Sequence, residues 1–351
     1  MKNNSYIKIA SIYVGTIIGA GFASGQEIMN FFGKFGLNGL IGIIIATVLF
    51  CLIGSIILLT AYNSGMYSYN ELLERIFGKS ISIIIDSFII LFLIAGYCIM
   101  LAGSGAIFSE QYNIDNNIGI LIMAIATFIT FIFSVKGLST VNTIIVPFLL
   151  ISIIYIGLTV ILNEGINIST LNYINLNHNH KFIISSVTYV GYNMIPALVI
   201  LTSVGSLVDS KKTAIKGGVL GGLFLGILAF FILMPSLILY SDVSASELPM
   251  LNISSYSDYR GKYLYSIILW FAMFTTAIGN GFGIITRIKQ MFNISQIKIC
   301  FLFCFISIFL AKFGFSNLIM ILYPIFGYIS FLIMIFALLK FVYENLYYYL
   351  K

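Results

Sequence analysis

The polar groups best placed for chemistry lie in the first hydrophobic stretch of the chain, residues 9–32. Its Gly19–Gly21 run (GAG) has almost no side-chain bulk, so another backbone or a ligand can approach it closely. Ser24–Glu27 follows with the Ser-x-x-Glu spacing of a capping box, in which Ser24 and Glu27 satisfy the free N–H groups of a new helix start. We therefore expect the helix to break here and to begin again.

A helix start inside a membrane would give this stretch a binding function. Irregular backbone at that depth is tolerated where it lines a protein-enclosed site, and broken helices build the substrate and ion sites of secondary transporters. Free N–H groups at residues 23–26 would receive a carboxylate, aided by the helix dipole, and carbonyls or Glu27 would receive an ammonium. The alternative is a glycine-rich face that packs against another helix.

The composition indicates a polytopic helical membrane protein. The 351 residues are 60% hydrophobic and 9% charged, with a mean hydropathy of +1.05. A span needs about 20 apolar residues, and such runs recur along the whole chain. The net charge of +6 lies in short loops, so we expect the lipid bilayer as partner and no nucleic acid. No cofactor is expected, and the sequence leaves protein partners open.

We predict ten spans, near residues 7–32, 36–63, 80–111, 117–135, 138–162, 181–207, 214–240, 262–288, 296–312 and 315–339. With both termini in the cytoplasm, five of the 18 Lys and Arg residues fall outside: Lys34, Lys181, Arg260, Lys262 and Lys312. This bias follows the positive-inside rule. The segment 67–79 reads as an amphipathic helix at the cytoplasmic interface. The composition suggests a bacterial cytoplasmic (plasma) membrane.

Span six contains a second predicted interruption, Tyr189–Pro196. Pro196 removes a helix donor and disfavours helix just before it. Gly191 adds flexibility, and Asn193 adds a polar side chain at the same depth. Interruptions five spans apart predict two inverted five-helix repeats. We place repeat one at about 7–162, repeat two at about 181–339 and a C-terminal interfacial tail at 340–351, all in one membrane domain, 1–351.

Segment 13–27, YVGTIIGAGFASGQE, resembles the start of YkvI-like membrane proteins. These are grouped as amino-acid permeases in the amino acid–polyamine–organocation (APC) superfamily. The resemblance implies the LeuT-type fold, with the first and sixth helices unwound at the substrate site. It also implies alternating access and small amino-acid-like substrates.

The resemblance also implies where a sodium ion would bind. Sodium-coupled LeuT-type transporters are similar in an Ala-x-x-Ser/Thr-Ser/Thr spacing on the eighth span, here AMFTT at 272–276. The implied ligands are two hydroxyls and three carbonyls, carried over as Thr275, Thr276, Ala272, Gly15 and Ile18. Unwound backbone offers oxygen ligands to a hard cation without burying a charge. Alone, adjacent threonines bond back to their own helix.

Intramembrane acids compete for the coupling role, because ionisable groups at depth are functional candidates. Glu27 would bind the substrate ammonium, carry a proton or act as the partner of Ser24. Asp86 would pair with a lysine near the inner end or face cytoplasmic water.

These patterns predict a secondary active transporter for a small neutral amino acid or similar zwitterion. Sodium is the expected coupling ion, and the alternatives are proton coupling and a ligand sensor without flux. We find no catalytic constellation, so we do not expect an enzyme. The predicted substrate site consists of Gly19, Ala20, Gly21, Ala23, Ser24, Gly25, Glu27, Tyr97, Tyr189, Gly191 and Asn193.

Overall fold

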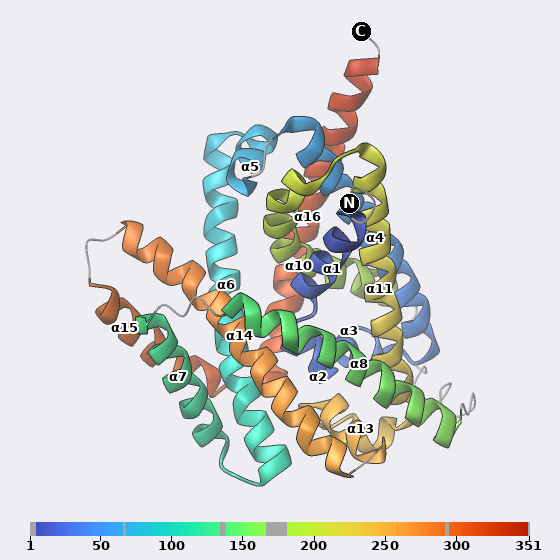
Figure 1. Ribbon diagram of the computed structural model, residues 1–351, viewed down its shortest axis with the longest axis vertical. Helices are drawn as coiled ribbons and strands as arrows, with labels where there is room; N and C mark the ends of the chain where they lie inside the picture. The colour runs from blue at the N-terminus through green and yellow to red at the C-terminus, as the bar shows by residue number, and fades with distance from the viewer. Residues whose placement is uncertain are drawn as a thin grey trace.

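The computed structural model describes residues 5–65, 68–133, 138–165, 181–257, 259–291 and 295–349, whose regular structure is helical throughout (Figure 1). The first half contributes α1 (Ser5–Ile17), α2 (Ala20–Ser24), α3 (Gln26–Phe31), the 3-10 turn η1 (Gly33–Phe35), α4 (Leu37–Ser64), α5 (Tyr69–Phe77), α6 (Lys79–Tyr112), α7 (Asn116–Phe133) and α8 (Leu138–Glu164). The second half contributes α10 (Lys181–Val204), the turn η2 (Gly205–Leu207), α11 (Lys211–Ile238), α12 (Tyr240–Val243), α13 (Pro249–Ser257), α14 (Tyr259–Met291), α15 (Gln296–Ala311) and α16 (Phe315–Tyr349).

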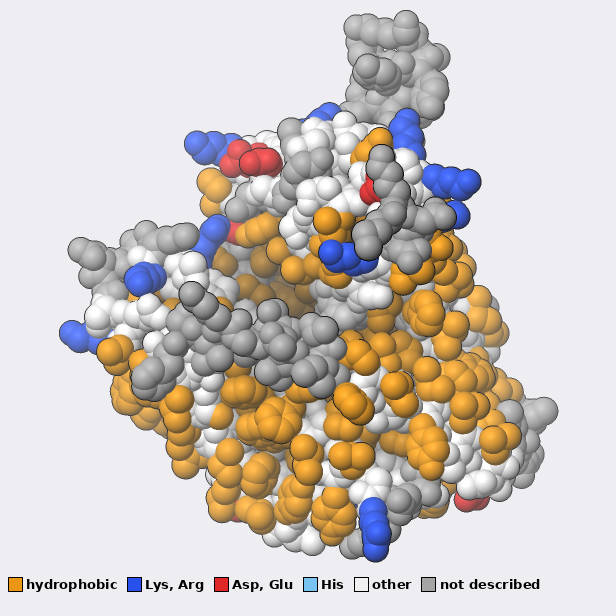
Figure 2. All heavy atoms as spheres, in the orientation of Figure 1, with side chains coloured by type: hydrophobic (Ala, Val, Ile, Leu, Met, Phe, Trp, Pro, Cys, Tyr) orange, Lys and Arg blue, Asp and Glu red, His pale blue; other side chains and the backbone are white. Residues whose placement is uncertain are grey.

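Each predicted span has a helical counterpart among the described residues. Seven helices are long and apolar enough to cross a membrane, and two shorter apolar helices cover 116–132 and 296–311. The first span is divided among α1, α2 and α3. Figure 2 shows a broad band of hydrophobic side chains across one face, with Lys and Arg gathered mostly toward its upper end. Such a surface suits a hydrocarbon environment.

Corresponding spans of the two halves are neighbours. α1 packs against α10, α4 along α11, α6 along α14, and α7 along α15. These pairs join the first four spans to the sixth through ninth, as expected for two repeats inverted relative to each other. The first span lies centrally, because α1 contacts α10 and α11 while α2 contacts α13 and α14.

Small residues hold α1 in this central place. A Cβ built on Gly222 of α11 would overlap the backbone of Cys51 in α4, so the two helices approach closely. Gly221 of α11 lies against the ring of Tyr13 in α1. The Tyr13 hydroxyl donates to the carbonyl of Phe50 in α4 at 3.0 Å. The end of α1, where the break begins, is therefore fixed between α4 and α11.

The structure corrects the predicted interruption of span six. α10 runs without a break from Lys181 to Val204, with Pro196 inside it. The Asn193 side chain donates to the carbonyl of Tyr189, four residues earlier, at 3.0 Å. Membrane helices tolerate an internal proline where neighbouring groups satisfy the freed backbone. The broken geometry is thus a property of the first span in this structure.

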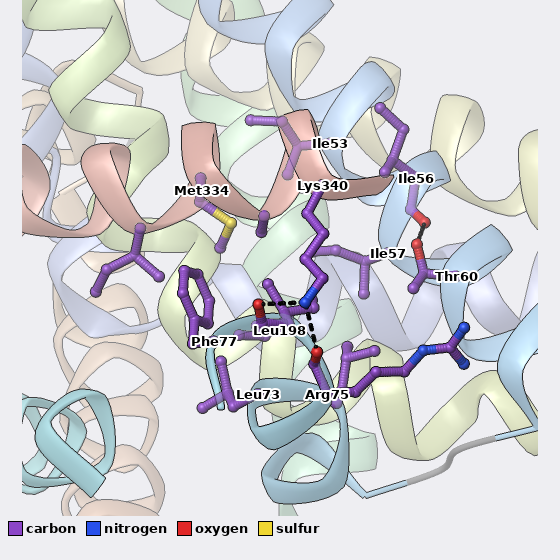
Figure 3. A pocket seen from close by; sticks show the side chains of 14 residues that line it. Ile53, Ile56, Ile57, Thr60, Leu73, Arg75, Phe77, Leu198, Met334 and Lys340 are labelled. Atoms are coloured by element: carbon purple, nitrogen blue, oxygen red, sulfur yellow. Dashed lines mark hydrogen bonds between the residues drawn. The ribbon is translucent and has the colours of Figure 1, made fainter. Parts of the chain in front are cut away.

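The segment between spans two and three forms the amphipathic helix α5. Its buried Leu72 and Leu73 line an apolar pocket of about 50 Å³ between α4, α5, α10 and α16 (Figure 3). At the rim, Lys340 Nζ donates to the carbonyl oxygens of Arg75 at 2.8 Å and Ile76 at 2.9 Å. A cation at a helix C-terminus satisfies free carbonyls and complements the dipole. The contact therefore fastens α5 to α16.

The last helix continues through most of the segment predicted as an interfacial tail. α16 is helical to Tyr349, and residues 350 and 351 lie outside the described part of the chain. Both termini lie toward the end of the bundle that carries α5, opposite α13 (Figure 1). We call these the predicted cytoplasmic end and the predicted outer end.

Candidate substrate and ion site

The first span is interrupted twice. Helix α1 ends at Ile17, and α2 begins at Ala20 after the non-helical residues Ile18 and Gly19. Gly25 then separates α2 from α3 with φ of 82°, a left-handed conformation that glycine adopts without strain. The predicted break in this span is confirmed. Two joints thus enclose a short helix, α2, near the centre of the bundle.

The first joint redirects backbone hydrogen bonds. The Gly19 N–H donates to the carbonyl of Ile17 at 2.8 Å. In a continuous α-helix, that N–H would donate to the carbonyl of Gly15. The Gly15 carbonyl therefore loses its usual donor at the point where the sequence predicts an ion ligand.

The predicted capping box between Ser24 and Glu27 does not form, and Ser24 is instead the last residue of α2. Its hydroxyl accepts the Gln26 N–H at 3.2 Å and donates to the Gly21 carbonyl at 2.7 Å. The cap residue of α3 is Gly25, and the Glu27 side chain turns away from Ser24. The reciprocal bond of the capping box is therefore replaced by contacts between Glu27 and other spans.

Glu27 lies in a buried cluster of tyrosines. Its side chain is 5% exposed, and the Tyr192 hydroxyl of α10 donates to its carboxylate. The Tyr323 hydroxyl of α16 donates to it as well, and the Tyr323 ring stacks on Tyr192 with centroids 4.4 Å apart. A Cβ built on Gly21 would overlap the carboxylate. Glu27 therefore lies directly over the predicted break.

This acid is held by hydroxyl groups and not by a cation. Within the described residues, the recorded ion pair joins Arg287 to Asp86, on α14 and α6. A buried carboxylate without a cationic partner is costly to keep charged. Glu27 is thus suited to take a proton or to meet a positive group on a substrate.

Helix α13 covers the break from the predicted outer end. A Cβ built on Gly25 would lie 2.9 Å from the Met250 side chain. Tyr265 of α14 donates to the Ala23 carbonyl at 2.5 Å. Ala20, Ala23 and Ser24 are fully buried. The candidate site is therefore closed toward the predicted outer end.

The contacts that close this end include two acids. Glu110 of α6 accepts bonds from the Ser246 hydroxyl at 2.8 Å and the Glu247 N–H at 2.6 Å. Glu247 in turn accepts backbone N–H groups of Phe315 and Ser316 at the start of α16. We call Glu110, Glu247 and these partners the outer latch.

The side chains predicted on spans three and six divide into two groups. Tyr189 lies with Glu27, since its ring contacts those of Phe31 and Tyr192. Gly191 packs against the backbone of Gly327 in α16, and the Asn193 amide bonds within its own helix. Gly191 thus serves the α10–α16 contact, whereas the Asn193 amide bond stays within α10.

Tyr97 is directed to another part of the bundle. Its hydroxyl contacts Thr127 of α7 at 2.8 Å and Cys304 of α15 at 3.3 Å. Its ring packs against Phe303 at 4.5 Å. The contacts of Tyr97 therefore join α6 to α7 and α15.

The predicted sodium ligands lie on two neighbouring segments. Thr275 and Thr276 of α14 donate to the carbonyl of Ala272 at 3.1 and 2.8 Å. A Cβ built on Gly19 would lie 3.8 Å from the Thr276 hydroxyl oxygen, so the first joint faces this turn of α14. Each hydroxyl oxygen keeps lone pairs that could bind a cation. All five predicted ligands are neutral oxygen atoms, which suits a hard monovalent cation.

A cavity approaches the first joint from the predicted cytoplasmic end. It has a volume of about 940 Å³ between α1, α8 and α11. Its lining runs from Tyr6 and Lys8 to Val14 and Gly15. Its inner limit at Gly15 therefore lies beside the predicted ion ligands.

Asp86 lies at the predicted cytoplasmic end, away from the break. It pairs with Arg287 of α14 and accepts the Tyr69 hydroxyl of α5 at 2.9 Å. This arrangement ties α5, α6 and α14 together. The sequence left Asp86 either with a lysine partner or facing cytoplasmic water, and the structure provides an arginine partner.

Sequence reasoning missed three residues around the break. Tyr323 and Tyr265 look like ordinary aromatic residues of apolar spans, and Met250 belongs to a loop segment. The one available signal was Tyr323-Pro324, a hydroxyl beside a helix-breaking residue in the last span. Their roles depend on contacts between distant spans.

Comparison with known proteins places the chain among bacterial membrane proteins. No family model matches the sequence. The chain is 32% identical over 333 residues to the uncharacterized membrane protein YkvI of Bacillus subtilis (strain 168), covering 94% of each chain. It is 27% identical over 328 residues to the protein YyaD of the same organism, covering 93% of this chain and 94% of YyaD.

Solved structures share the architecture at low sequence identity. The inward-facing conformation of Mhp1 matches with a TM-score of 0.65 at 13% identity, covering 93% of this chain and 73% of Mhp1. MhsT in complex with L-phenylalanine matches with a TM-score of 0.64 at 16% identity, covering 95% and 88%. A manganese transporter mutant of Eremococcus coleocola matches with a TM-score of 0.61 at 13% identity, covering 94% and 77%. The fold is therefore the LeuT-type fold of transporters, and the chain is a multi-pass membrane protein that belongs to the YkvI family.

Proposed function

We propose that this protein is a secondary active transporter that moves a small neutral amino acid or a similar zwitterion by alternating access. The observation that carries the proposal is the doubly interrupted first span. Its α2 segment lies between a cover at one end, formed by α13, and a cavity that reaches Gly15 from the other. A site covered at one end and approached by a cavity from the other corresponds to one of the two states that alternating access requires.

The chemistry at the break supports a zwitterionic substrate. The N–H groups of Ala23, Gly25 and Gln26 donate within the chain, to Gly19, Phe22 and Ser24, so a carboxylate would be favoured here by the dipole of the helix that begins at Gln26. Glu27 supplies a negative group for an ammonium within the same turn of chain. The fit to MhsT, solved with L-phenylalanine, is consistent with this substrate class. The close approach of Glu27 to Gly21 favours a small substrate.

Sodium is the coupling ion that we propose, as a transported substrate. Thr275, Thr276 and the Ala272 carbonyl on α14, with the Gly15 and Ile18 carbonyls, would hold it. All five ligands are neutral oxygens, so sodium would bring the positive charge into the site without a counter-ion. Such a site would tie the two ends of the first joint to α14.

Glu27 favours a second candidate, proton coupling at the same break. It is buried, bonded to two tyrosine hydroxyls and unpaired with any Lys or Arg in the described residues. A carboxyl in that setting can exchange a proton with each transport cycle. Glu27→Gln removes this exchange while keeping the side-chain shape.

Flux in reconstituted liposomes tests the proposal. Uptake of labelled neutral amino acids is measured with an inward sodium gradient, with an inward proton gradient and with none. Accumulation driven by sodium, and abolished when Thr275 and Thr276 are both alanine, supports the proposed site. Accumulation driven by protons and lost in Glu27→Gln supports the second candidate. Saturable binding without flux under every gradient would refute transport and favour a ligand sensor.

A further inference from the structure

A second cavity lies at the predicted outer end, on the far side of α3 from the Glu27 cluster. Its volume is about 640 Å³, within the range of ligand sites. It is bounded by α3 and η1, by the first two turns of α10, by residues 319–328 of α16, by α12 and by the start of α13. Lys34 and Lys181 contribute side chains to its lining. We call it the two-lysine groove.

The groove holds positive charge without a described counter-charge. Neither Lys34 nor Lys181 has a carboxylate within salt-bridge distance among the described residues. Asp242 of α12 is engaged by Tyr256 and Ser241. Partial burial and the charge of Lys181 lower the pKa of Lys34, which lies in η1 beyond the spans. An anion placed between the two ammonium groups would relieve this repulsion.

A buried hydrogen-bond donor beside the groove also favours a bound anion. The Asn30 side-chain nitrogen is buried and has no hydrogen-bond partner within the described structure. Buried polar groups are normally satisfied, so a donor of this kind has a physical reason to be there. Asn30 lines the groove with Lys34, and a rotation of its side chain that turned this nitrogen into the groove would let a bound oxyanion satisfy both.

Below the lysines, the groove is apolar and open toward the membrane. Ile184 of α10 is 52% exposed, and Met320 and Tyr328 of α16 are 55% and 54% exposed. All three line the cavity. From Lys181 to Thr188, α10 descends about 10 Å at 1.5 Å per residue, which carries the groove from headgroup level toward hydrocarbon.

We propose that the two-lysine groove binds one anionic glycerophospholipid from the adjacent leaflet. The phosphate would lie between Lys34, Lys181 and Asn30, and part of one acyl chain would lie along Ile184 and the exposed face of α16. Basic pockets between spans bind anionic headgroups in this way. A water-borne anion would satisfy the lysines but would not account for the apolar lower half of the groove.

The bound lipid would contact elements that close the transport site. The groove is bounded by α3, which carries Glu27, and by Tyr240 and Val243 of α12 next to the outer latch. Gln26, which also lines it, donates to Ser316 of α16. Occupancy therefore bears on the α3–α16 contact, which shares Ser316 with the outer latch.

The test measures lipid dissociation constants of the full-length protein by native mass spectrometry in detergent. The probes are phosphatidylglycerol, phosphatidylcholine and free glycerol 3-phosphate. At about fivefold per lysine, phosphatidylglycerol should bind about thirtyfold more tightly than phosphatidylcholine. Lys34→Gln or Lys181→Gln should each cut this preference about fivefold, and the double variant should remove it.

Matched variants separate binding in the groove from a general effect of charge and from a purely polar anion site. The double variant K262Q/K312Q removes the same charge at the same predicted end, outside the groove, and should keep the preference. Ile184→Trp fills the lower groove at an exposed position, so it should weaken phosphatidylglycerol and leave glycerol 3-phosphate unchanged. Retained preference in both Lys34→Gln and Lys181→Gln would overturn the proposal. Equal binding of glycerol 3-phosphate and phosphatidylglycerol would show a polar anion site instead.

Discussion

The hydroxyl of Tyr192 on α10 donates to the carboxylate of Glu27 on α3, so the two halves of the chain meet through a buried hydrogen bond beside the break. Tyr323 of α16 completes the arrangement by stacking on Tyr192 at 4.4 Å. The carboxylate position is thus set by two spans of the second half.

Tyr192→Phe should slow transport without unfolding the protein. The ring stacking is kept, but one hydroxyl donor to a charged group is lost, worth about 1.5–3 kcal/mol. We expect initial uptake rates to fall roughly tenfold in liposomes, with little change in Tm. Tyr256→Phe, which removes an exposed hydroxyl near Asp242, is the matched control. Uptake equal to that of the control would show that the Glu27 position does not matter.

Gly21→Ala should strongly reduce uptake in a folded protein. The added Cβ would overlap the Glu27 carboxylate and displace it from its tyrosine partners, and a larger residue such as Gly21→Leu should act more strongly. Gly279→Ala is the matched control, because nothing lies within 4 Å of its added Cβ. Uptake and elution in size-exclusion chromatography are measured for both. Wild-type uptake in Gly21→Ala would mean that the break is not the transport site.

Thr276→Ala should raise the sodium concentration needed for half-maximal uptake. Removal of one oxygen ligand costs about 1–2 kcal/mol, which corresponds to roughly a tenfold shift. Thr130→Ala is the control, because the Thr130 hydroxyl also bonds four residues back, to the Ala126 carbonyl at 2.8 Å. The measurement is uptake against sodium concentration at fixed substrate. An identical curve for both variants would remove Thr276 from the ion site.

Acid pH should keep the outer latch closed. Burial, and then the charge of Glu110, raise the pKa of Glu247 above its usual 4.5, and one of its carboxylate oxygens is buried without a partner. A raised pKa means that the closed latch binds a proton more tightly than an open one. Closure is therefore favoured as pH falls through this raised pKa and weakened as pH rises through it.

Thiol labelling of α13 measures this closure. In a background without the four native cysteines, Met250→Cys is shielded in the closed latch, whereas Ser255→Cys on the same helix is exposed. The ratio of their labelling rates cancels the intrinsic pH dependence of the thiol. This ratio should fall severalfold from pH 8 to pH 5 and become pH-independent in Glu247→Gln. A pH-dependent ratio in Glu247→Gln would exclude Glu247 as the titrating group.

The span pattern and the broken first helix were predictable because they depend on local sequence. Long apolar runs set the spans, and Gly19 and Gly25 remove the side chains that would oppose the two joints. Pro196 misled the prediction for span six, since α10 contacts many neighbours and remains helical around it. A proline in the sequence shows that a backbone N–H donor is missing, but it does not show whether neighbouring groups satisfy the backbone carbonyl left free.

Individual site residues were harder to predict because their roles depend on distant partners. One of the roles expected of Glu27 was a local cap for Ser24, but Tyr192 and Tyr323, which lie far along the chain, bond its carboxylate instead. Tyr97 shares a helical stripe with Met100 and Ser104, yet its hydroxyl contacts Thr127 and Cys304. Helical periodicity predicts which face of a helix a residue occupies but not which helix that face meets.

Helix α16 contacts three places that would otherwise act separately. Its first residues bond Glu247, Tyr323 bonds Glu27, and Lys340 bonds the end of α5. One helix therefore connects the outer latch, the Glu27 cluster and α5, so that movement at one end of the bundle would be transmitted to the other. Pro324 lies inside this helix, between the first contact and the last. Under the proposed transport function, a bend at Pro324 would let one end of α16 release its contacts while the other end keeps them, so that substrate would not leak along a continuously open path.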